Sequence, residues 1–259
     1  MTSVPEKYAL VTGGTSGIGL ELARLLAADK YGVVLVARSG EDLRRVSFEL
    51  EETYGLGVLA IASDLSQPGS PQHVADTLER QGIVPEILVN SAGFATHGPF
   101  ASSDLAGQES LVGLNVSALT VLTRLMLPGM LASKKGRILN LASTAAFLPG
   151  PQMAAYYASK AYVLSFSQAL SYELRATGVT VTCLCPGPTK TGFAQRAGLQ
   201  ESPLFKNAAD VRTVASAGYA GMLAGKDLVI PGFLSRLKTG ISRFIPRRIL
   251  LAIAAKAQD

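Results

Sequence analysis

The sequence predicts an α/β fold: a doubly wound parallel sheet of about seven strands with helices on both faces, followed by a C-terminal helical tail. Short apolar runs rich in β-branched residues alternate with longer stretches of helical periodicity. The runs are apolar at successive positions, which is typical of strands buried between two helical layers. Glycines precede several of the runs, where helices usually end. Ligands of such a fold bind at the carboxyl ends of the strands, so functional residues are expected there.

The elements are expected in the following order along the chain. The strands are Tyr8–Thr12, Val33–Val36, Val58–Ala62, Ile87–Asn90, Arg137–Ala142, Val179–Leu184 and Asp227–Ile230. The helices are Glu21–Asp29, Glu41–Thr53, Val74–Gln81, Leu105–Met130 and Tyr156–Thr177. The glycines expected to end helices before strands are Gly32, Gly57, Gly82, Gly136 and Gly178. No linker divides the first 231 residues, so we expect one domain over residues 1–231 and a basic amphipathic extension over residues 232–259.

The composition places the chain among globular proteins. It has 259 residues, of which 48% are hydrophobic and 17% are charged, with a mean hydropathy of +0.28. These values exclude a disordered, collagen-like or coiled-coil chain. The net charge is +5, but residues 1–225 carry 17 basic and 17 acidic groups, whereas residues 226–259 carry seven and two. The positive charge therefore belongs to the C-terminal extension.

The cysteines and the apolar runs indicate the compartment. Cys183 and Cys185 lie two residues apart on one face of an expected strand, poorly placed for a disulfide and too few for a zinc site. We therefore expect buried thiols in a reducing compartment and no metal. The N-terminus lacks the pattern of a signal peptide, and no uninterrupted apolar run reaches the roughly 18–20 residues that span a bilayer. We expect a cytoplasmic protein, with peripheral membrane contact as an alternative for the extension.

A glycine-rich turn, TGGTSGIG over residues 12–19, follows the first strand and precedes the first helix. Its glycines can supply a tight turn, close backbone approach to a pyrophosphate and close helix–strand packing. The spacing differs from the generic G-x-G-x-x-G pattern, and a glycine turn without a ligand is the alternative. The strand before it and the helix after it favour dinucleotide binding in a Rossmann fold. The residues expected to bind are Gly13, Thr15, Ser16, Gly17, Ile18 and Gly19.

The end of the second strand indicates which dinucleotide binds. A ribose 2′-hydroxyl calls for an acidic side chain there, whereas a 2′-phosphate calls for an arginine. The chain has Arg38 and Ser39 at this point and no acid, and a guanidinium can bind phosphate with paired hydrogen bonds. The alternative is that Arg38 merely begins a solvated helix. We favour NADP(H) over NAD(H).

Tyr156 and Lys160 are four residues apart in an expected helix and therefore share one face, from which Tyr157 is rotated away. A phenol has a pKa near 10. A cation about 5 Å away, at an effective dielectric of about 20, is worth roughly 3 kcal/mol, or about two pK units. We expect this to bring the pKa of Tyr156 towards neutrality, where it can exchange a proton with a carbonyl or alcohol oxygen. Such pairs also occur by chance on helices.

Two further polar residues support the pair. Ser143 follows the fifth strand at its carboxyl end, where its hydroxyl can hydrogen-bond a substrate oxygen. Asn115 lies on an apolar helical stripe, where an amide is costly unless it has buried partners. A polar network, for example around a catalytic water, is a natural role, and a core asparagine that caps a kink is the alternative. The expected catalytic residues are Asn115, Ser143, Tyr156 and Lys160.

Together these motifs resemble those of the short-chain dehydrogenase/reductase family. The resemblance runs from Tyr8 to about Pro188 and adds Asp64 after the third strand, NSAG at 90–93 and PGPT at 186–189. Two departures are visible: Ser91 stands where the usual turn has asparagine, and the last strand reads DLVIPGF, without the V-D-G-G ending of tetrameric members. A homo-oligomer is therefore expected, with a dimer favoured over a tetramer.

The resemblance also implies roles for individual residues. Tyr156 would be the general acid/base, Ser143 would orient the substrate oxygen, and Lys160 would bind the nicotinamide ribose and lower the tyrosine pKa. Asn115 would hold a water in a proton relay. Asp64 would contact adenine, although a helix N-cap is the alternative. The further positions expected to contact the cofactor are Leu65, Asn90, Ala92, Gly93, Pro186, Gly187 and Thr189.

The extension carries a helical stripe of apolar residues with basic residues mostly off the stripe. The stripe consists of Phe233, Leu234, Leu237, Ile241, Phe244 and Ile245. We expect it to pack on the parent domain or on a second subunit, with contact of residues 233–257 to an anionic membrane surface as the alternative. Nucleic acid is not expected as a partner, because no aromatic side chains interleave with the charges.

The sequence therefore predicts an NADPH-dependent oxidoreductase that interconverts a carbonyl and a secondary alcohol. A lid is expected over Thr191–Asp210, and its apolar residues favour a hydrophobic small-molecule substrate. One alternative is an NADP(H)-binding redox sensor or scaffold without turnover. The other is a membrane-surface protein that acts through its tail.

Overall fold

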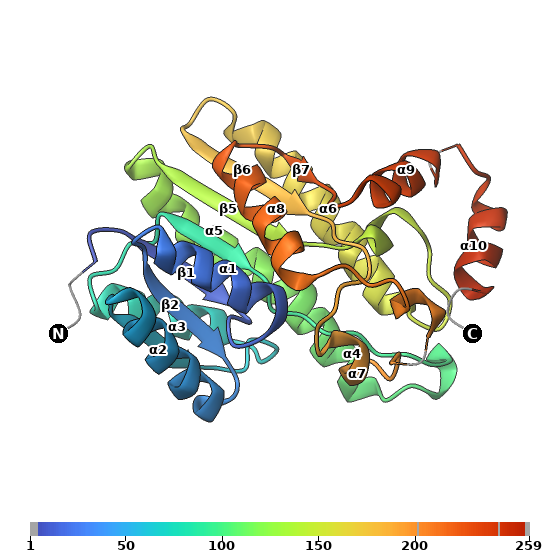
Figure 1. Cartoon of the computed structure of the whole chain (residues 1–259), viewed down its shortest axis with the longest axis horizontal. Helices are drawn as coiled ribbons and strands as arrows, with labels where there is room; N and C mark the ends of the chain where they lie inside the picture. Colours follow the sequence, from blue (N-terminus) through green and yellow to red (C-terminus); the bar gives the residue numbers. More distant parts are fainter. Residues whose placement is uncertain (1–4, 201, 243, 257–259) are drawn as a thin grey trace.

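A computed structural model describes residues 5–200, 202–242 and 244–256. Seven parallel strands form one sheet in the order β3-β2-β1-β4-β5-β6-β7 (Figure 1). The strands are β1 (Tyr8–Thr12), β2 (Gly32–Ala37), β3 (Val58–Ala62), β4 (Ile87–Asn90), β5 (Gly136–Leu141), β6 (Val179–Leu184) and β7 (Leu228–Val229). The predicted doubly wound sheet is confirmed, and each strand end lies within one residue of its expected position.

Helices cover both faces of the sheet. In the described residues they are α1 (Gly17–Ala28), α2 (Gly40–Tyr54), α3 (Ser70–Arg80), α4 (Leu105–Val112), α5 (Leu119–Ala132), α6 (Ala154–Leu174), α7 (Phe193–Arg196), α8 (Val211–Leu223), α9 (Phe233–Ser242) and α10 (Arg247–Lys256). Helices α1, α2 and α8 share a buried cluster with one face of the sheet. Helices α3, α5 and α6 share a second cluster with the other face.

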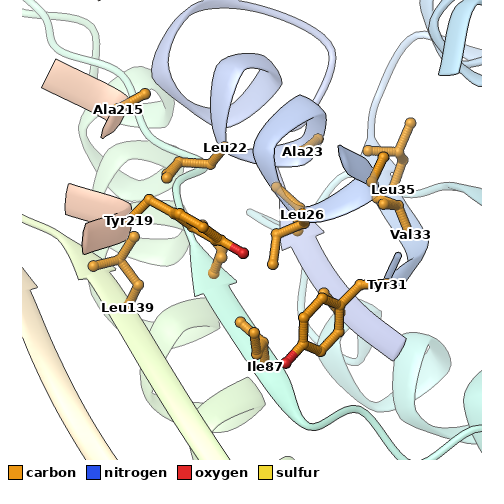
Figure 2. Packing of buried hydrophobic residues seen from close by; sticks show 14 of the residues in the cluster. Leu22, Ala23, Leu26, Tyr31, Val33, Leu35, Ile87, Leu139, Ala215 and Tyr219 are labelled. Atoms are coloured by element: carbon orange, nitrogen blue, oxygen red, sulfur yellow. The ribbon is translucent and has the colours of Figure 1, made fainter. Parts of the chain in front are cut away.

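Figure 2 shows the first of these clusters, in which helix and strand side chains meet directly. Leu22 and Leu26 of α1 are fully buried and lie beside Tyr219 of α8, over residues such as Leu139 of β5. The Tyr219 hydroxyl keeps a polar partner at the edge of the cluster, since it donates to Asp29 Oδ2 at 2.6 Å. This layer holds α1, and with it the glycine-rich turn that precedes α1, firmly against the sheet.

The helix bounds show where the sequence pattern was insufficient. Helix α1 begins four residues before its expected start, because the glycine-rich turn gives its first residues no apolar periodicity. Helix α8 was not predicted, although Asp210 caps it by accepting a hydrogen bond from the Thr213 amide at 3.0 Å. The expectation that glycines end the helices was wrong for Gly57, because Gly55, at φ +68°, closes α2 instead. It was also wrong for Gly32 and Gly136, which begin β2 and β5, since the C-caps of α1 and α5 are Asp29 and Ser133.

Helices α4 and α5 form one long helix that is interrupted by a π-helical segment, Gly113–Ala118. Among the described residues, this helix alone is long and apolar enough to cross a membrane by length and composition. Its inner residues Leu111, Leu122 and Met130 are buried in the core. A π-helical segment inside an α-helix is frequent at functional sites, and this one contains Asn115.

The C-terminal extension forms α9 and α10, at the end of the molecule farthest from α2 (Figure 1). Its apolar stripe was expected to pack on the parent domain or on a second subunit. Packing on the parent domain is wrong, and packing on a second subunit stays a prediction. Phe233, Leu234, Leu237 and Ile241 are exposed, whereas Thr239 and Ser242 of the same helix are buried. Helix α9 thus turns small polar residues towards the domain. It contacts the turn Thr144–Phe147 after β5, and its Ser235 hydroxyl lies 3.0 Å from the position of a Cβ at Gly187 after β6.

Candidate active site

The site lies at the carboxyl edge of the sheet, where β1 and β4 are neighbours and their connections leave to opposite sides. Thr12 ends β1 beside Asn90 at the end of β4. The Thr12 hydroxyl accepts hydrogen bonds from the Ser91 and Ala92 amides, each at 3.1 Å. The glycine-rich turn and the NSAG turn are therefore joined at the position where doubly wound sheets bind ligands.

Two glycines of the first turn have no room for a side chain. Gly13 has φ +65°, and a Cβ there would lie 2.9 Å from the Cα of Ala92. A Cβ at Gly19 would overlap the carbonyl oxygen of Gly13. The backbone of the turn is therefore packed tightly against its neighbours, as expected of a glycine turn whose amides approach a pyrophosphate closely.

The N-terminus of α1 supports the same ligand. Its N-cap Ser16 makes no side-chain cap hydrogen bond, and its first turn contains no acid, so the first amides are available to an anion. Thr15, Ile18 and Gly17 are half-buried around this point. The side chain of Thr191 lies 3.3 Å from the position of a Cβ at Gly17. Thr191 was not among the expected cofactor residues, and its place in the loop after β6 gave no signal of this contact.

Arg38 and Ser39 lie between β2 and α2, as expected. Ser39 caps α2 by accepting from the Asp42 amide at 3.1 Å, so this hydroxyl is already in use. Arg38 is exposed, and so is Arg44, one turn into α2. Neither arginine forms an ion pair within the described residues, whereas Arg45 pairs with Asp42 at 2.9 Å. Two unpaired guanidinium groups are thus available near the expected position of a 2′-phosphate.

Several expected cofactor residues have side chains that are occupied elsewhere. Asn90 is buried and donates to Thr123 at 3.1 Å and to Asn140 at 2.9 Å. Leu65 is buried in the core cluster shared with α3, α5 and α6. Asp64 accepts from the amide and hydroxyl of Ser66 and does not cap α3, whose N-cap is Gly69. Contact of these three residues with a cofactor stays a prediction.

Asn115 holds the site together rather than lying free in it. Its Oδ1 accepts from the Phe94 amide at 3.1 Å, and its Nδ2 donates to the Phe94 carbonyl at 3.0 Å and to the Ser159 hydroxyl at 3.1 Å. Both amide hydrogens are therefore used. The side chain links the NSAG turn to α6, so in this structure it is a positioning group, and its expected contact with a catalytic water stays a prediction.

Ser143, Tyr156 and Lys160 come together at the end of β5. Ser143 forms a side-chain hydrogen bond with Tyr156, and its hydroxyl also accepts from the Ala145 amide at 3.1 Å. Lys160 Nζ donates to the Leu141 carbonyl at 2.8 Å and lies 5.8 Å from the centre of the Tyr156 ring. The structure thus assembles the three residues that the sequence singled out, and the lysine is held by a backbone carbonyl of β5.

The electrostatics differ from the sequence-based expectation. Burial raises the pKa of the Tyr156 phenol above its ordinary value, and the hydrogen bond with Ser143 acts only partly against this. Burial also lowers the pKa of Lys160, to about 8. The expected lowering of the pKa of Tyr156 was wrong, because removing the phenol from water raises its pKa and the nearby cation does not offset this.

The loop after β6 completes the edge. The Pro186 carbonyl accepts from the Thr144 amide at 2.9 Å and from the Ser143 hydroxyl at 3.4 Å. Thr189 is buried, and its hydroxyl donates to the Gly187 carbonyl at 2.9 Å. This loop therefore helps to fix Ser143 through the Pro186 carbonyl, and contact of Pro186, Gly187 and Thr189 with a cofactor stays a prediction.

An apolar cluster surrounds the Tyr156 ring. The Phe193 ring of α7 lies 5.4 Å from it, centre to centre. The other members of the cluster include Phe94, Leu111, Met153, Ala197, Leu199 and Phe205. Phe193, Ala197, Leu199 and Phe205 come from the segment expected to form a lid, so this segment covers the tyrosine and makes its surroundings hydrophobic.

Sequence comparison gives relatives that match the same part of the chain. The family model described as "short chain dehydrogenase" matches residues 7–202. A very-long-chain 3-oxoacyl-CoA reductase of Anas platyrhynchos is 35% identical over 185 residues, which are 69% of this chain and 58% of that protein. A putative ketoacyl reductase 1 of the granaticin polyketide synthase of Streptomyces violaceoruber is 39% identical over 196 residues, 74% of this chain and 71% of that protein. The chain thus spans about three fifths of the length of the first of these relatives.

Solved structures agree over nearly the whole chain. A short-chain dehydrogenase from Sphingobium yanoikuyae in complex with NADPH has a TM-score of 0.82 and 31% identity, and the match covers 93% of this chain and 97% of that one. A short-chain dehydrogenase/reductase from Burkholderia phymatum in complex with NAD resembles it in fold, with a TM-score of 0.84, 24% identity and coverage of 95% and 98%. Both complexes hold a nicotinamide dinucleotide.

Proposed function

Since the chain belongs to the short-chain dehydrogenase/reductase family, we propose that it is an NADPH-dependent reductase that interconverts a carbonyl and a secondary alcohol on a hydrophobic substrate. The observation that carries the proposal is the meeting of Ser143, Tyr156 and Lys160 at the carboxyl edge of the sheet, beside a glycine turn shaped for a pyrophosphate. Relatives named as ketoacyl and 3-oxoacyl-CoA reductases support a carbonyl substrate.

Different residues of the chain bind the cofactor and transfer the proton. The turn at Gly13–Gly19 and the amides of α1 hold the pyrophosphate, and Arg38 binds the 2′-phosphate. A bound nicotinamide dinucleotide supplies or accepts the hydride. Ser143 hydrogen-bonds the substrate oxygen, and the Tyr156 hydroxyl gives its proton to that oxygen in reduction and takes it back in oxidation. The Lys160 cation stabilises the negative charge that develops on the phenol.

The protonation states of Tyr156 and Lys160 at neutral pH fit the proton transfer of a reduction. Because burial raises the pKa of Tyr156, the phenol is protonated at neutral pH and ready to donate. Because the pKa of Lys160 is about 8, the amine is still mostly charged at neutral pH. It is therefore a cation at the moment when the proton leaves Tyr156. Reduction of a carbonyl uses these protonation states directly, whereas oxidation of an alcohol first requires the loss of a proton from the phenol.

The apolar cluster around Tyr156 indicates the chemical class of the substrate. Phe94, Met153 and Phe193 offer apolar surface to whatever lies against the phenol, so we propose a carbonyl carried on a hydrophobic body or acyl chain rather than on a sugar. A series of methyl ketones of increasing chain length, assayed by the loss of NADPH absorbance, tests this. We expect kcat/KM to rise with each added methylene group until the chain fills the cluster, and a flat series would argue against it.

Replacement of the catalytic phenol tests the reaction itself. Tyr156→Phe should lower kcat by about 10²- to 10⁴-fold, the usual contribution of a general acid, while the Kd for NADPH measured by fluorescence titration stays the same. Tyr157→Phe is the matched control, since its ring is retained against Gly150, and it should retain activity. Full activity in Tyr156→Phe would reject the mechanism.

We also propose a dimer rather than a tetramer. The sheet ends in a strand of only two residues, β7, and the chain leaves it through Pro231 and Gly232 directly into α9, so this edge offers little backbone for a further subunit. Light scattering of the purified protein tests the expectation.

We propose that residues 1–231 form the dinucleotide-binding and catalytic domain. We also propose that the protein is cytoplasmic and that residues 232–259 make its contacts with other partners.

A further inference from the structure

The C-terminal helices expose many large apolar side chains, although these helices are attached to the domain. Phe233 is 76% exposed on α9 and Phe244 is 88% exposed in the connection to α10. The exposed large apolar residues of this surface, which we call the tail face, are Phe233, Leu234, Leu237, Ile241, Phe244, Ile249, Leu251 and Ile253. Exposed large apolar residues that gather on two successive helices in this number are typical of an interaction site.

The tail face is bordered by cations alone. Arg236, Lys238, Arg247 and Arg248 are exposed, and the sequence from residue 228 to residue 258 contains no aspartate or glutamate. At 3.6 residues per turn, Arg236 and Lys238 lie on opposite sides of the α9 stripe. An apolar stripe with basic residues along both of its borders is the pattern of a helix that lies in a membrane interface.

We propose that the tail face docks this protein on an anionic lipid bilayer, with its apolar side chains among the upper acyl chains and its arginines and lysines at the headgroup phosphates. The charges favour this partner over a second copy of the chain, because two copies joined through the same face would bring cations against cations. The opposite side of α9 is already covered: Thr239 and Ser242 are buried there, and α9 contacts the turn Thr144–Phe147 of the domain. The outer face therefore needs a partner other than the domain.

The docked orientation places the active site near the lipid. Helix α9 contacts the turn Thr144–Phe147, which directly follows Ser143, and the Ser235 hydroxyl lies 3.0 Å from the position of a Cβ at Gly187. The carboxyl edge of the sheet is thus beside the root of the tail face. On the proposed reductase function, on which this step rests, the substrate is an apolar carbonyl compound dissolved in the bilayer, which reaches Tyr156 without crossing water.

Co-sedimentation of the full chain with vesicles tests the docking. The vesicles contain phosphatidylcholine alone or phosphatidylcholine with phosphatidylserine, and the salt concentration is varied. We expect binding to the anionic vesicles that weakens with salt. Phe233→Asp with Leu237→Asp should abolish it. Lys238→Gln with Arg248→Gln should weaken it by roughly 30-fold, because each cation near such a surface contributes about fivefold to the partition.

Controls separate docking from folding and from catalysis. Phe48→Asp changes an equally exposed phenylalanine on α2, at the other end of the molecule (Figure 1), and should leave vesicle binding unchanged. All variants should keep the wild-type melting temperature and the wild-type turnover of a water-soluble ketone. Absence of turnover in the wild type would reject the reductase function and leave the vesicle result intact.

Two results would overturn the docking proposal. One is equal binding to neutral and anionic vesicles, or none to either. The other is a light-scattering measurement without lipid in which Phe233→Asp with Leu237→Asp converts a dimer into a monomer, which would identify a second copy as the occupant of the tail face.

Discussion

At the scale of single residues, Gly93 shows how closely the groups around Tyr156 depend on one another. A Cβ at this position would lie 3.0 Å from Asn115 Oδ1 and 3.6 Å from Lys160 Nζ. Any side chain would therefore push against the amide that fixes the NSAG turn and against the cation beside the phenol. The φ of Gly93 is not in the left-handed region, so the backbone conformation does not require a glycine here. The close neighbours of the position require it.

The pH dependence of reduction should follow Lys160. Its pKa in the folded protein is lowered to about 8 by burial, so the amine is charged below pH 8 and neutral above it. The raised pKa of Tyr156 keeps the phenol protonated over the same range. We therefore expect kcat/KM for reduction to be constant below about pH 7 and to fall as the pH rises through 8.

Lys160→Arg provides the control for this profile. A guanidinium does not titrate in this range, so a variant that keeps some activity should lose the fall near pH 8. The same profile in both proteins would assign the titration to another group. Measurement of kcat/KM with one ketone from pH 6 to pH 10, with NADPH saturating, distinguishes the two cases.

The cofactor preference should depend on Arg38. Loss of a charged hydrogen-bonding partner costs about 1.5–3 kcal/mol, so Arg38→Asp should raise the Kd for NADPH by about ten- to a hundredfold and leave that for NADH similar or lower. Arg45→Gln is the matched control, because Arg45 is on the same surface but already paired with Asp42. If the native protein binds NADH more tightly than NADPH, the preference that we propose is wrong.

Side-chain direction limited what could be predicted for individual residues. The spacing of Tyr156 and Lys160 on a helix identifies a shared face, and Ser143 follows from its place after a strand, so these three could be found from the sequence. Asn90 could not be assigned in the same way, because only the structure shows its amide turned to Asn140 in the core. Thr12 carried no separate signal, although its hydroxyl joins the two turns.

At the scale of elements, strands were more predictable than helices. Each strand is a short run that is apolar on both faces, and this pattern has few alternatives. Helix α8 has a good N-cap in Asp210 but a run of alanine and glycine in place of large apolar residues, so its periodicity is weak. For α9, the apolar stripe could be predicted from the sequence. An amphipathic pattern shows which residues share a face of a helix, but it does not show whether that face packs on the domain.

The short helix α7 should act as a cover for the substrate. Phe193 lies against the Tyr156 ring, so Phe193→Ala should raise KM for an apolar ketone by about tenfold, the effect of losing a modest apolar contact, with kcat and NADPH binding little changed. Phe100→Ala removes a phenylalanine that is 64% exposed and should have no such effect. An unchanged KM in Phe193→Ala would show that the substrate lies elsewhere.

At the scale of the whole molecule, the parallel sheet collects residues that are far apart in the sequence. Every strand in the described residues ends at the same edge, so the turns after β1, β4, β5 and β6 meet there. Sequence order alone predicts this convergence once the strands are parallel. Helix α9 is attached beside the same edge, where Ser235 fits closely against Gly187. The hydrophobic periodicity of the sequence does not predict this contact.

Because the glycine turn, the end of β2 and the NSAG turn are brought together only by folding, the dinucleotide should bind the native state and not the unfolded chain. NADPH at 100 times its Kd should then raise the free energy of unfolding by about 2.7 kcal/mol. For a chain of this size that corresponds to a rise of roughly 5–10 °C in Tm, measurable by calorimetry. Tyr156→Phe should show the same rise, since the phenol handles the proton and not the pyrophosphate. A rise in neither protein would contradict dinucleotide binding, and a rise only in the wild type would make Tyr156 a binding residue.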